Sequence, residues 1–341
     1  MKLCAVYRSE QINAFYRAFL PMVTMRERGH EIVEVLQERG TPLPLDRLGS
    51  CDFVHIHRLV LDDDHPDDDC VARLQDRGVA VGFDDDDNSE AAPPELEGIV
   101  AEGSLERAKT DFERLLARAP QIDLFTTPSP DLAARFEAAG ADNVRVIDNY
   151  LPGAFHRVKP NGHDGIVIGW HAAEEHLLDV EALGLRETLV RVLDADPGVE
   201  LVTVGIDLRL DHERYRREEG VPIAELTQRL ADFDIGLAPL ADTPFNRARS
   251  NVKAREYAAA GVPWLASPVG AYRELGKDQG GQLVGDGDWQ AALEDLIRSG
   301  RERARLQRRG RKWAERETIW KMAEVWEQAF ADTIADVRAA A

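Results

Sequence analysis

The residues from Asp234 to Ser267 read DIGLAPLADTPFNRARSNVKAREYAAAGVPWLAS, which is an apolar run, a polar loop, a helical pattern and a second apolar run. The first run, 235–240, predicts a buried strand that ends in the loop. Ser250 stands where the N-cap of the following helix is expected, and the helix is predicted to end at Gly261, two residues before Pro263. The stretch therefore predicts a strand, a helix and a second strand in the order of an α/β unit.

The start of this predicted helix has the properties of an anion site. Its unpaired N–H groups, together with about half a positive charge from the helix dipole, favour a phosphate. Arg247, Arg249 and Lys253 add formal positive charge at the same end. Glu256, three residues after Lys253, can accept hydrogen bonds from sugar or ribose hydroxyls. The alternative is an ordinary helix whose basic residues are solvated and whose Glu256 pairs with Lys253.

The same stretch resembles the nucleotide-sugar motif of GT-B glycosyltransferases of the family-4-like group (glycosyl transferases group 1). The shared pattern is Ser-Asn-x-Lys-x-x-Glu-Tyr from Ser250, followed by Ala-x-Gly-x-Pro from Ala259. The resemblance implies that Arg249 and Lys253 hold the diphosphate of a donor and that Glu256 binds its ribose. The donor-binding residues predicted in this way are Gly169, His171, His176, Asn246, Arg247, Arg249, Ser250, Asn251, Lys253 and Glu256.

The composition fits a chain of two globular domains that bind small molecules. The chain has 341 residues, of which 44% are hydrophobic and 30% charged, enough for two cores of ordinary size. Lys and Arg total 42 against 62 Asp and Glu, which gives a formal net charge of -20. This charge argues against nonspecific nucleic-acid binding, and the expected partners are a small-molecule donor and acceptor.

The cysteines and the N-terminal sequence favour a cytoplasmic protein. Cys4, Cys51 and Cys70 have neither paired metal spacing nor the density of a disulfide scaffold, which fits a reducing compartment. The first residues, MKLCAVYRS, contain an apolar run too short for a signal peptide, and no window approaches a transmembrane span. The oligomeric state is left open, because no residue pattern bears on it.

Strand and helix patterns alternate along the chain and predict a doubly wound α/β architecture. In the first half, strands are predicted at 3–7, 31–36, 53–57, 79–83, 122–126 and 144–147, and helices at 13–28, 71–78, 105–119 and 131–139. The second half has predicted strands at 166–169 and 201–204, helices at 181–195 and 223–231, and a helical end after Trp289.

We therefore expect two doubly wound Rossmann-like domains that face a cleft, as in the GT-B fold. The segment around Trp320 resembles the terminal helices of GT-B enzymes, which cross back to the first domain, and its aromatic residues are interpreted as structural. The predicted bounds are 1–155 for an N-terminal acceptor-side domain, 163–310 for a nucleotide-sugar-binding domain and 311–341 for the crossing helices.

Ligands of such sheets bind beyond the carboxyl ends of the strands, where loops of both halves meet. The predicted strand at 53–57 carries His55 and His57, which we interpret as facing opposite sides of the strand, so that only one reaches the cleft. His57 is nearer the carboxyl end and is our candidate. The pattern Asp-x-x-His-x-His, from Asp52, resembles a strand of the family at this place. A structural histidine is the alternative.

A run of acidic residues, from Asp84 to Asp87, follows the predicted strand at 79–83. Adjacent carboxylates repel one another, so the run indicates a bound cation, a cationic ligand or extensive hydrogen bonding. A metal-binding Asp-x-Asp is one interpretation. The family resemblance instead places Phe-Asp-x-Asp-Asp-Asn on the acceptor side, where Asp86 or Asp87 would orient an acceptor hydroxyl or amine. The other residues assigned to the acceptor side are Arg8, Asp84 and Asn149.

A second acidic cluster, at 62–64 and 67–69, is predicted to be a solvated loop and a helix start. The chain also departs from the family pattern. The family places a second glutamate eight residues before Glu256, where this chain has Ala248, and it uses Arg and Lys where this chain has His171 and His176. Histidine is mostly neutral near pH 7, so it binds diphosphate less firmly unless the phosphate raises its pKa.

The resemblance implies a glycosyltransferase of the hexosyltransferase type. It would move a sugar from a nucleoside-diphosphate-sugar donor to an unidentified hydroxyl or amine acceptor, without a metal or a further cofactor and with retention of configuration. If the reaction inverts configuration, His57, Asp86 or Asp87 is the candidate catalytic base. The alternatives are a binding or assembly protein that kept the fold and a nucleotide-sugar epimerase.

Overall fold

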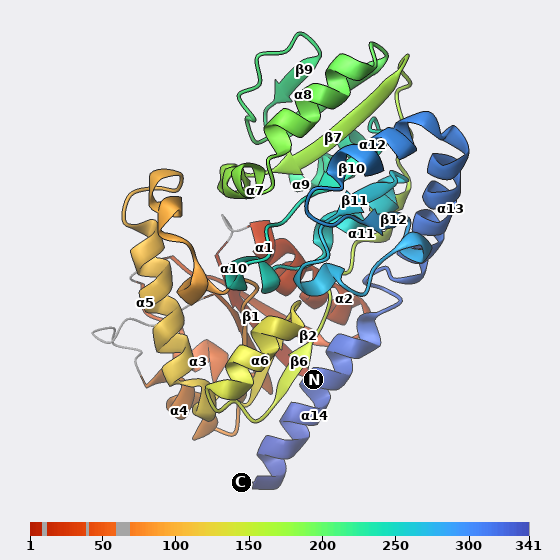
Figure 1. The fold of residues 1–341 in the computed structure, drawn as a ribbon. Helices are drawn as coiled ribbons and strands as arrows, with labels where there is room; N and C mark the ends of the chain where they lie inside the picture. Colours follow the sequence, from red (N-terminus) through yellow and green to blue (C-terminus); the bar gives the residue numbers. More distant parts are fainter. Residues whose placement is uncertain (9–11, 39–40, 59–68, 341) are drawn as a thin grey trace.

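The computed structural model describes residues 1–8, 12–38, 41–58 and 69–340, and it contains two six-stranded parallel sheets (Figure 1). The first sheet has the order β2-β1-β3-β4-β5-β6, formed by β1 (Lys2–Tyr7), β2 (Glu31–Leu36), β3 (Phe53–His57), β4 (Ala80–Asp84), β5 (Leu124–Thr127) and β6 (Val144–Val146). The second has the order β12-β11-β10-β7-β8-β9, formed by β7 (Ile166–Ala172), β8 (Val199–Gly205), β9 (Tyr215–Glu218), β10 (Ile235–Ala238), β11 (Trp264–Ala266) and β12 (Gly281–Leu283). The prediction of two doubly wound Rossmann-like domains is confirmed.

Helices connect the strands of each sheet. Those of the first domain are α1 (Ile12–Ala14), the π-helix η1 (Phe15–Phe19), α2 (Leu20–Glu27), α3 (Leu45–Leu48), α4 (Cys70–Gln75), α5 (Ser104–Ala117) and α6 (Pro130–Ala138). The later helices are α7 (Leu177–Ala182), α8 (Leu185–Ala195), α9 (Ile223–Leu230), α10 (Pro244–Arg247), α11 (Val252–Ala260), α12 (Trp289–Arg298), α13 (Gly300–Arg316) and α14 (Ala323–Ala340). None of the helices in the described ranges combines the length and apolar character needed to cross a bilayer.

Both faces of the first sheet are buried, and β1 shows how the sequence achieves this. Leu3 and Ala5 belong to an apolar cluster that includes Trp326 of α14, whereas Cys4 and Val6 belong to the cluster on the opposite face. Side chains alternate between the two faces of a strand, so a sheet covered on both sides needs continuous apolar runs. The C-terminal helix α14 therefore crosses back onto the first sheet, as expected (Figure 1).

The sequence analysis misses α3, most of α7, β9, α10 and β12. β9 reads YRRE and lies at the edge of the second sheet, where its charged side chains stay partly or fully exposed. α10 and β12 are only four and three residues long, too short to show a periodic pattern. These elements are set by pairing and packing within the folded domain rather than by local apolar periodicity.

The chain passes between the domains at two places that lie side by side. Leu151, which follows the first sheet, forms a parallel bridge with Thr318, which follows α13. Arg255 of α11 donates to Asp148 at 2.6 Å and to Glu317 at 2.7 Å. One guanidinium thus ties both crossing segments to α11. The domain bounds drawn from the sequence, 1–155, 163–310 and 311–341, stay a prediction.

Candidate functional site

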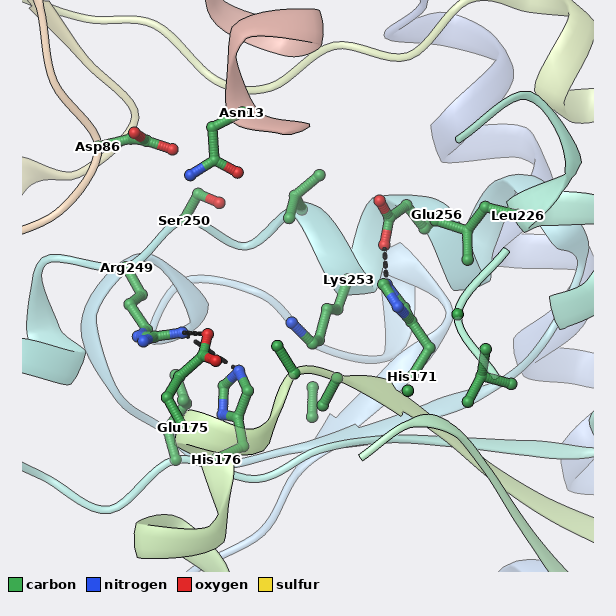
Figure 2. Close-up of a pocket in the computed structure, with 18 of the residues that line it drawn as sticks. Asn13, Asp86, His171, Glu175, His176, Leu226, Arg249, Ser250, Lys253 and Glu256 are labelled. Carbon is green, nitrogen blue, oxygen red and sulfur yellow. Dashed lines mark hydrogen bonds and ion pairs between the residues drawn. The ribbon is translucent and has the colours of Figure 1, made fainter. Parts of the chain in front are cut away.

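A cleft of about 470 Å³ lies between the two domains (Figure 2). Asn13, Tyr16, Asp86 and Asp87 of the first domain line one side. The second domain builds the other side from the ends of β7, β8 and β10 and from the start of α11, so the cleft lies at the carboxyl ends of parallel strands, where ligands of doubly wound sheets bind. The charged and histidine side chains on this side are His171, Glu174, Glu175, His176, Arg249, Lys253 and Glu256.

Glu256 lines the cleft from α11 with both carboxylate oxygens already in hydrogen bonds. The Tyr16 hydroxyl donates to Oε1 at 2.6 Å. Oε2 lies 2.9 Å from His171 Nε2 (Figure 2). Burial alone would raise the pKa of this carboxyl, but His171, Tyr16 and Lys253 together lower it, so Glu256 is ionised at neutral pH. An ionised carboxylate has about four lone-pair sites and keeps some of them for the hydroxyls of a ligand.

The start of α11 differs from the sequence expectation. Asn251, and not Ser250, is the N-cap residue, and its side chain makes no capping bond because it accepts from Arg255 Nε at 3.0 Å. The Ser250 hydroxyl instead accepts from Asn149 Nδ2 at 3.2 Å, across the two domains. The predicted helix end is confirmed, since Gly261 is the C-cap with a φ of 78°.

Two cations, Lys253 and Arg249, line the cleft on the side predicted for a diphosphate. Lys253 lies on α11 and makes no ion pair with any residue that the structure describes. Arg249 lies over the Phe245 ring, at 4.8 Å from its centre. Its Nη1 is 3.5 Å from Glu175 Oε1 (Figure 2). Burial lowers the pKa of Lys253, Glu256 opposes this shift and Arg249 adds to it. An anion bound between the two cations would offset their repulsion.

His176 lies beside these cations as a buried neutral imidazole. Its Nδ1 is 2.8 Å from Asp179 Oδ2, and its Nε2 is 3.2 Å from Arg249 Nη1. Burial, together with Lys253 and Arg249, lowers the pKa of His176 to about 4. The neutrality expected from the sequence at this position is therefore reinforced by its surroundings, and Asp179 is a partner that no sequence pattern indicated.

Some of the predicted donor residues do not line the cleft, namely Gly169, Asn246, Arg247 and Asn251. Gly169 faces the Phe233 ring, where an added Cβ would lie 2.0 Å from a ring carbon. Arg247 forms a two-point ion pair with Asp242 at 2.6 and 3.0 Å on the surface. These four residues thus lie outside the cleft lining, and their predicted donor role stays a prediction.

Asp84 belongs to a fully buried ion pair and not to the cleft wall. Arg17 Nε lies 3.1 Å and Arg17 Nη2 2.6 Å from its carboxylate, and the Thr126 hydroxyl donates to it at 2.5 Å. Arg17 also donates to Asn149 Oδ1 at 3.0 Å. Removing one partner of the buried pair leaves an uncompensated charge, so Arg17 and Asp84 stabilise the first domain at this point, while Asn149 links Arg17 to Ser250 of the second domain. Asp84 and Asn149 are buried and do not line the cleft, and their assignment to the acceptor side stays a prediction.

His55 and His57 lie on the same face of β3, because residues two apart along a strand share a face, so the interpretation that they face opposite sides is wrong. His55 Nε2 lies 2.9 Å from the Arg17 carbonyl oxygen. His57 is fully buried, and its Nε2 lies 3.7 Å from Asp86 Oδ1 and 3.9 Å from Asp84 Oδ1. His57 therefore does not line the cleft, and Asp86, which does, lies between His57 and the cleft.

Arg58 binds the acidic run that follows β4. Its Nε lies 2.5 Å from Asp86 Oδ1, and its Nη2 lies 2.5 Å from Asp87 Oδ2. Burial raises the pKa of Asp86, but Arg58 and His57 outweigh it and hold this pKa below its usual range. Burial and the neighbouring carboxylates raise the pKa of Asp85 to about 7, against the effect of Arg58. Over the residues described, no three His, Cys, Asp or Glu side chains are grouped to hold a metal ion.

Tyr16 and Arg17 are functional-site neighbours that the sequence analysis misses. Both lie in the π-helix η1, where one extra residue in the turn shifts the direction of the following side chains. Tyr16 thereby meets Glu256, and Arg17 meets Asp84. The sequence feature that could have indicated Tyr16 and Arg17 is their polar side chains within an otherwise apolar helical stretch, 14–20.

The two-domain architecture is shared with solved structures, whereas the sequence itself has no recognised match. No protein-family model matches the sequence, and no curated protein matches it. Among solved structures, HepE from Anabaena in complex with UDP-glucose is 14% identical, with a TM-score of 0.63 over 98% of this chain and 100% of that chain. The fold is GT-B.

Two further GT-B neighbours differ in length and description. TarM from S. aureus, in a complex that contains UDP, is 12% identical with a TM-score of 0.59; the match covers 82% of this chain, which spans only 55% of the TarM chain. A Listeria monocytogenes protein described as a UDP-N-acetylglucosamine 2-epimerase is 15% identical with a TM-score of 0.54, over 94% of this chain and 93% of that one. At these identities the likeness is one of fold.

Two residues and one acidic cluster singled out in the sequence lie away from the cleft lining or outside the described residues. Ala248, where the family has its second glutamate, is buried in the apolar cluster of the first domain, so the site contains no second carboxylate there. Arg8 follows β1 directly and does not line the cleft. Of the second acidic cluster, 62–64 and 67–68 lie outside the described residues, and Asp69 is the N-cap of α4 without a capping bond.

Proposed function

We propose that this protein is a glycosyltransferase that moves a sugar from a nucleoside-diphosphate-sugar donor to a hydroxyl or amine acceptor. The supporting observation is the arrangement of one cleft, in which Arg249, Lys253 and Glu256 line the second-domain side and Asp86 and Asp87 the first-domain side. A diphosphate suits the two cations, a ribose suits the ionised Glu256, and the opposite wall is left for the acceptor. UDP-glucose, which is bound in the HepE structure, has this donor chemistry.

In the proposed reaction, the bond between the sugar C1 and the diphosphate oxygen breaks, and a bond between C1 and the acceptor oxygen or nitrogen forms. Arg249 and Lys253 stabilise the negative charge that develops on the leaving phosphate. The acceptor proton passes to an oxygen of that phosphate. Asp86 is a poor base because its pKa is held low by Arg58 and His57, which supports retention over an inverting route through a protein base.

A thermal-shift screen of UDP, ADP, GDP and CDP, followed by transfer assays with the matching nucleotide sugars, tests this proposal. A true donor nucleotide stabilises the fold that it binds, so at least one of them should raise the Tm. Lys253→Ala should remove this shift. Asp242→Asn, which alters an exposed carboxylate outside the cleft, should keep it. If none of the four nucleotides raises the Tm of the wild-type protein, the proposal fails.

Two finer parts of the proposal have their own measurements. Retention is tested by the anomeric coupling constant of the product in proton NMR, and a product of inverted configuration would contradict it. Independence from metal ions is tested by adding an excess of EDTA. Transfer should continue at the same rate, whereas activity that stops and returns with Mn²⁺ would restore the metal-binding interpretation of Asp84 to Asp87.

Two other candidate functions rest on separate observations. The likeness to the Listeria epimerase supports a nucleotide-sugar epimerase, which needs no acceptor and would convert UDP-N-acetylglucosamine when incubated with it alone. The alanine at 248 and the histidine at 171 support a binding protein without turnover, which would bind the donor but release no nucleoside diphosphate with any acceptor. The transfer assay separates the glycosyltransferase from the other two candidates, and incubation with UDP-N-acetylglucosamine alone separates the epimerase, which forms an epimer, from the binding protein, which does not.

A further inference from the structure

Behind the phosphate-facing wall of the cleft, hydrogen bonds hold one carboxylate in a fixed orientation. Asp179 is 4% exposed, and its Oδ1 accepts from Asn246 Nδ2 at 2.7 Å and from the Ala241 N–H at 2.9 Å. Its Oδ2 is left facing His176 Nδ1 at 2.8 Å. Because both donors bind the same oxygen, the other oxygen points at the imidazole.

The same contacts decide where the imidazole carries its proton. Arg249 has only donors, so His176 Nε2, at 3.2 Å from Arg249 Nη1, accepts. In the neutral ring the proton then lies on Nδ1, which donates to Asp179. His176 lines the cleft beside Arg249 and Lys253, and its Nε2 is therefore the ring atom available to a bound phosphate once Arg249 turns to that phosphate.

We propose that Asp179 is a positioning residue that allows His176 to take up one proton when a diphosphate binds, so that the phosphate site gains a third positive charge. The proposal rests on the proposed donor function of the cleft. When a phosphate oxygen replaces Nε2 as the acceptor of Arg249, Nε2 takes one proton from solvent and donates it as a hydrogen bond to the phosphate. No covalent bond between heavy atoms changes, and Asp179, still bound to Nδ1, stabilises the imidazolium.

The charged groups around His176 set the direction of this change. Arg249 and Lys253, together with burial, oppose the imidazolium in the free protein, while Asp179 and Glu175 favour it. A diphosphate adds negative charge on the side of the two cations and so reverses the balance. Proton uptake then makes diphosphate affinity fall as pH rises through the pKa of His176 in the complex.

Calorimetry with UDP in two buffers of different ionisation enthalpy counts the protons taken up on binding. Near pH 6 to 7, the wild-type protein should take up about one more proton than His176→Gln. Taking the difference between the two proteins cancels the protons bound or released by UDP itself. Long-range proton–nitrogen NMR of histidine-labelled protein should show His176 as the Nδ1–H form when free and doubly protonated in the UDP complex. Asp242→Asn is the matched control and should behave as wild type.

Asp179→Asn separates positioning from a merely structural role. In this variant, the carbonyl oxygen of the new amide side chain accepts from Asn246 and from the Ala241 N–H, so the amide NH₂ group faces His176 Nδ1. The imidazole proton is then forced onto Nε2, where it faces the Arg249 donor. UDP should bind about tenfold more weakly, because one charge-assisted hydrogen bond is lost. Binding should also take up no extra proton. NMR should show the Nε2–H form in the free variant.

Equal proton uptake in wild type and His176→Gln, or a neutral His176 in the UDP complex, would overturn this inference while leaving the donor site in place. These two measurements decide the matter even if Asp179→Asn does not fold. If neither UDP nor ADP, GDP or CDP binds, the proposed function is overturned, and this inference falls with it.

Discussion

Replacing Glu256 by Gln tests the donor assignment with almost no change in side-chain size. The variant still accepts from Tyr16, 2.6 Å away in the wild type, and can donate to a neutral His171, 2.9 Å away, so the ligand-free cleft keeps its contacts. It loses the charge. A hydrogen bond to a charged group contributes about 1.5–3 kcal/mol and a neutral one about 0.5–1.5 kcal/mol, so each of two ribose hydroxyls loses roughly 1–1.5 kcal/mol. The sum corresponds to a Kd that is about 30- to 150-fold higher.

The assay is isothermal titration calorimetry with UDP and with 2′-deoxy-UDP. The wild-type protein should prefer UDP, because only UDP offers both ribose hydroxyls to Glu256. In Glu256→Gln this preference should shrink as UDP binding weakens, whereas Asp242→Asn should keep both affinities. A variant that binds UDP as tightly as the wild type, or that keeps the full preference for UDP over its deoxy form, would refute the ribose assignment.

Three other substitutions probe neighbouring parts of the molecule. Asp84→Ala leaves the buried Arg17 guanidinium unpaired and should lower the free energy of unfolding by about 3–5 kcal/mol in urea denaturation followed by tryptophan fluorescence; a loss below about 1 kcal/mol would contradict the buried pair. Gly169→Ala places a Cβ 2.0 Å from the Phe233 ring and should cost about 1–3 kcal/mol of stability without weakening UDP binding, and the reverse result would restore its donor role. The pKa of Asp85, about 7, lies above its ordinary value of 3.8, so the native protein keeps a proton that the unfolded chain loses, and stability falls as pH rises through this window. Asp85→Asn should therefore gain stability over the wild type from pH 4 to pH 7, and identical pH profiles would speak against the raised pKa.

The sequence predicts strands better than it predicts side-chain partners. The predicted bounds of β2 and β3 agree with the structure because both are apolar or alternating runs flanked by turn residues. Ser250 was a poor guide to the start of α11, since serine and asparagine cap helices about equally well and the neighbouring Asn251 takes that position. Aromatic spacing likewise indicated a core helix without identifying its buried member, as Trp320 is 38% exposed while Trp326 is fully buried.

Contacts between the domains were beyond prediction for a physical reason. Tyr16 and Glu256 are 240 residues apart in the chain and meet only after both domains have folded and docked. The π-helical turn that directs Tyr16 has no periodicity of its own in the sequence. The second domain carried a recognisable donor motif, whereas the first-domain wall is defined by ion pairs, such as those of Arg58, that no spacing rule describes.

The paired crossing segments at Leu151 and Thr318, tied to α11 by Arg255, also have a mechanical meaning. Since both covalent connections between the domains pass beside one helix, a rotation of one domain against the other has its axis close to that helix. Points near an axis move least. Lys253 and Glu256 lie on α11 itself, so in such a rotation their part of the cleft wall would keep its geometry, while the first-domain wall would travel along a wider arc. Such a rotation would change the width of the cleft while Lys253 and Glu256 keep their positions relative to each other.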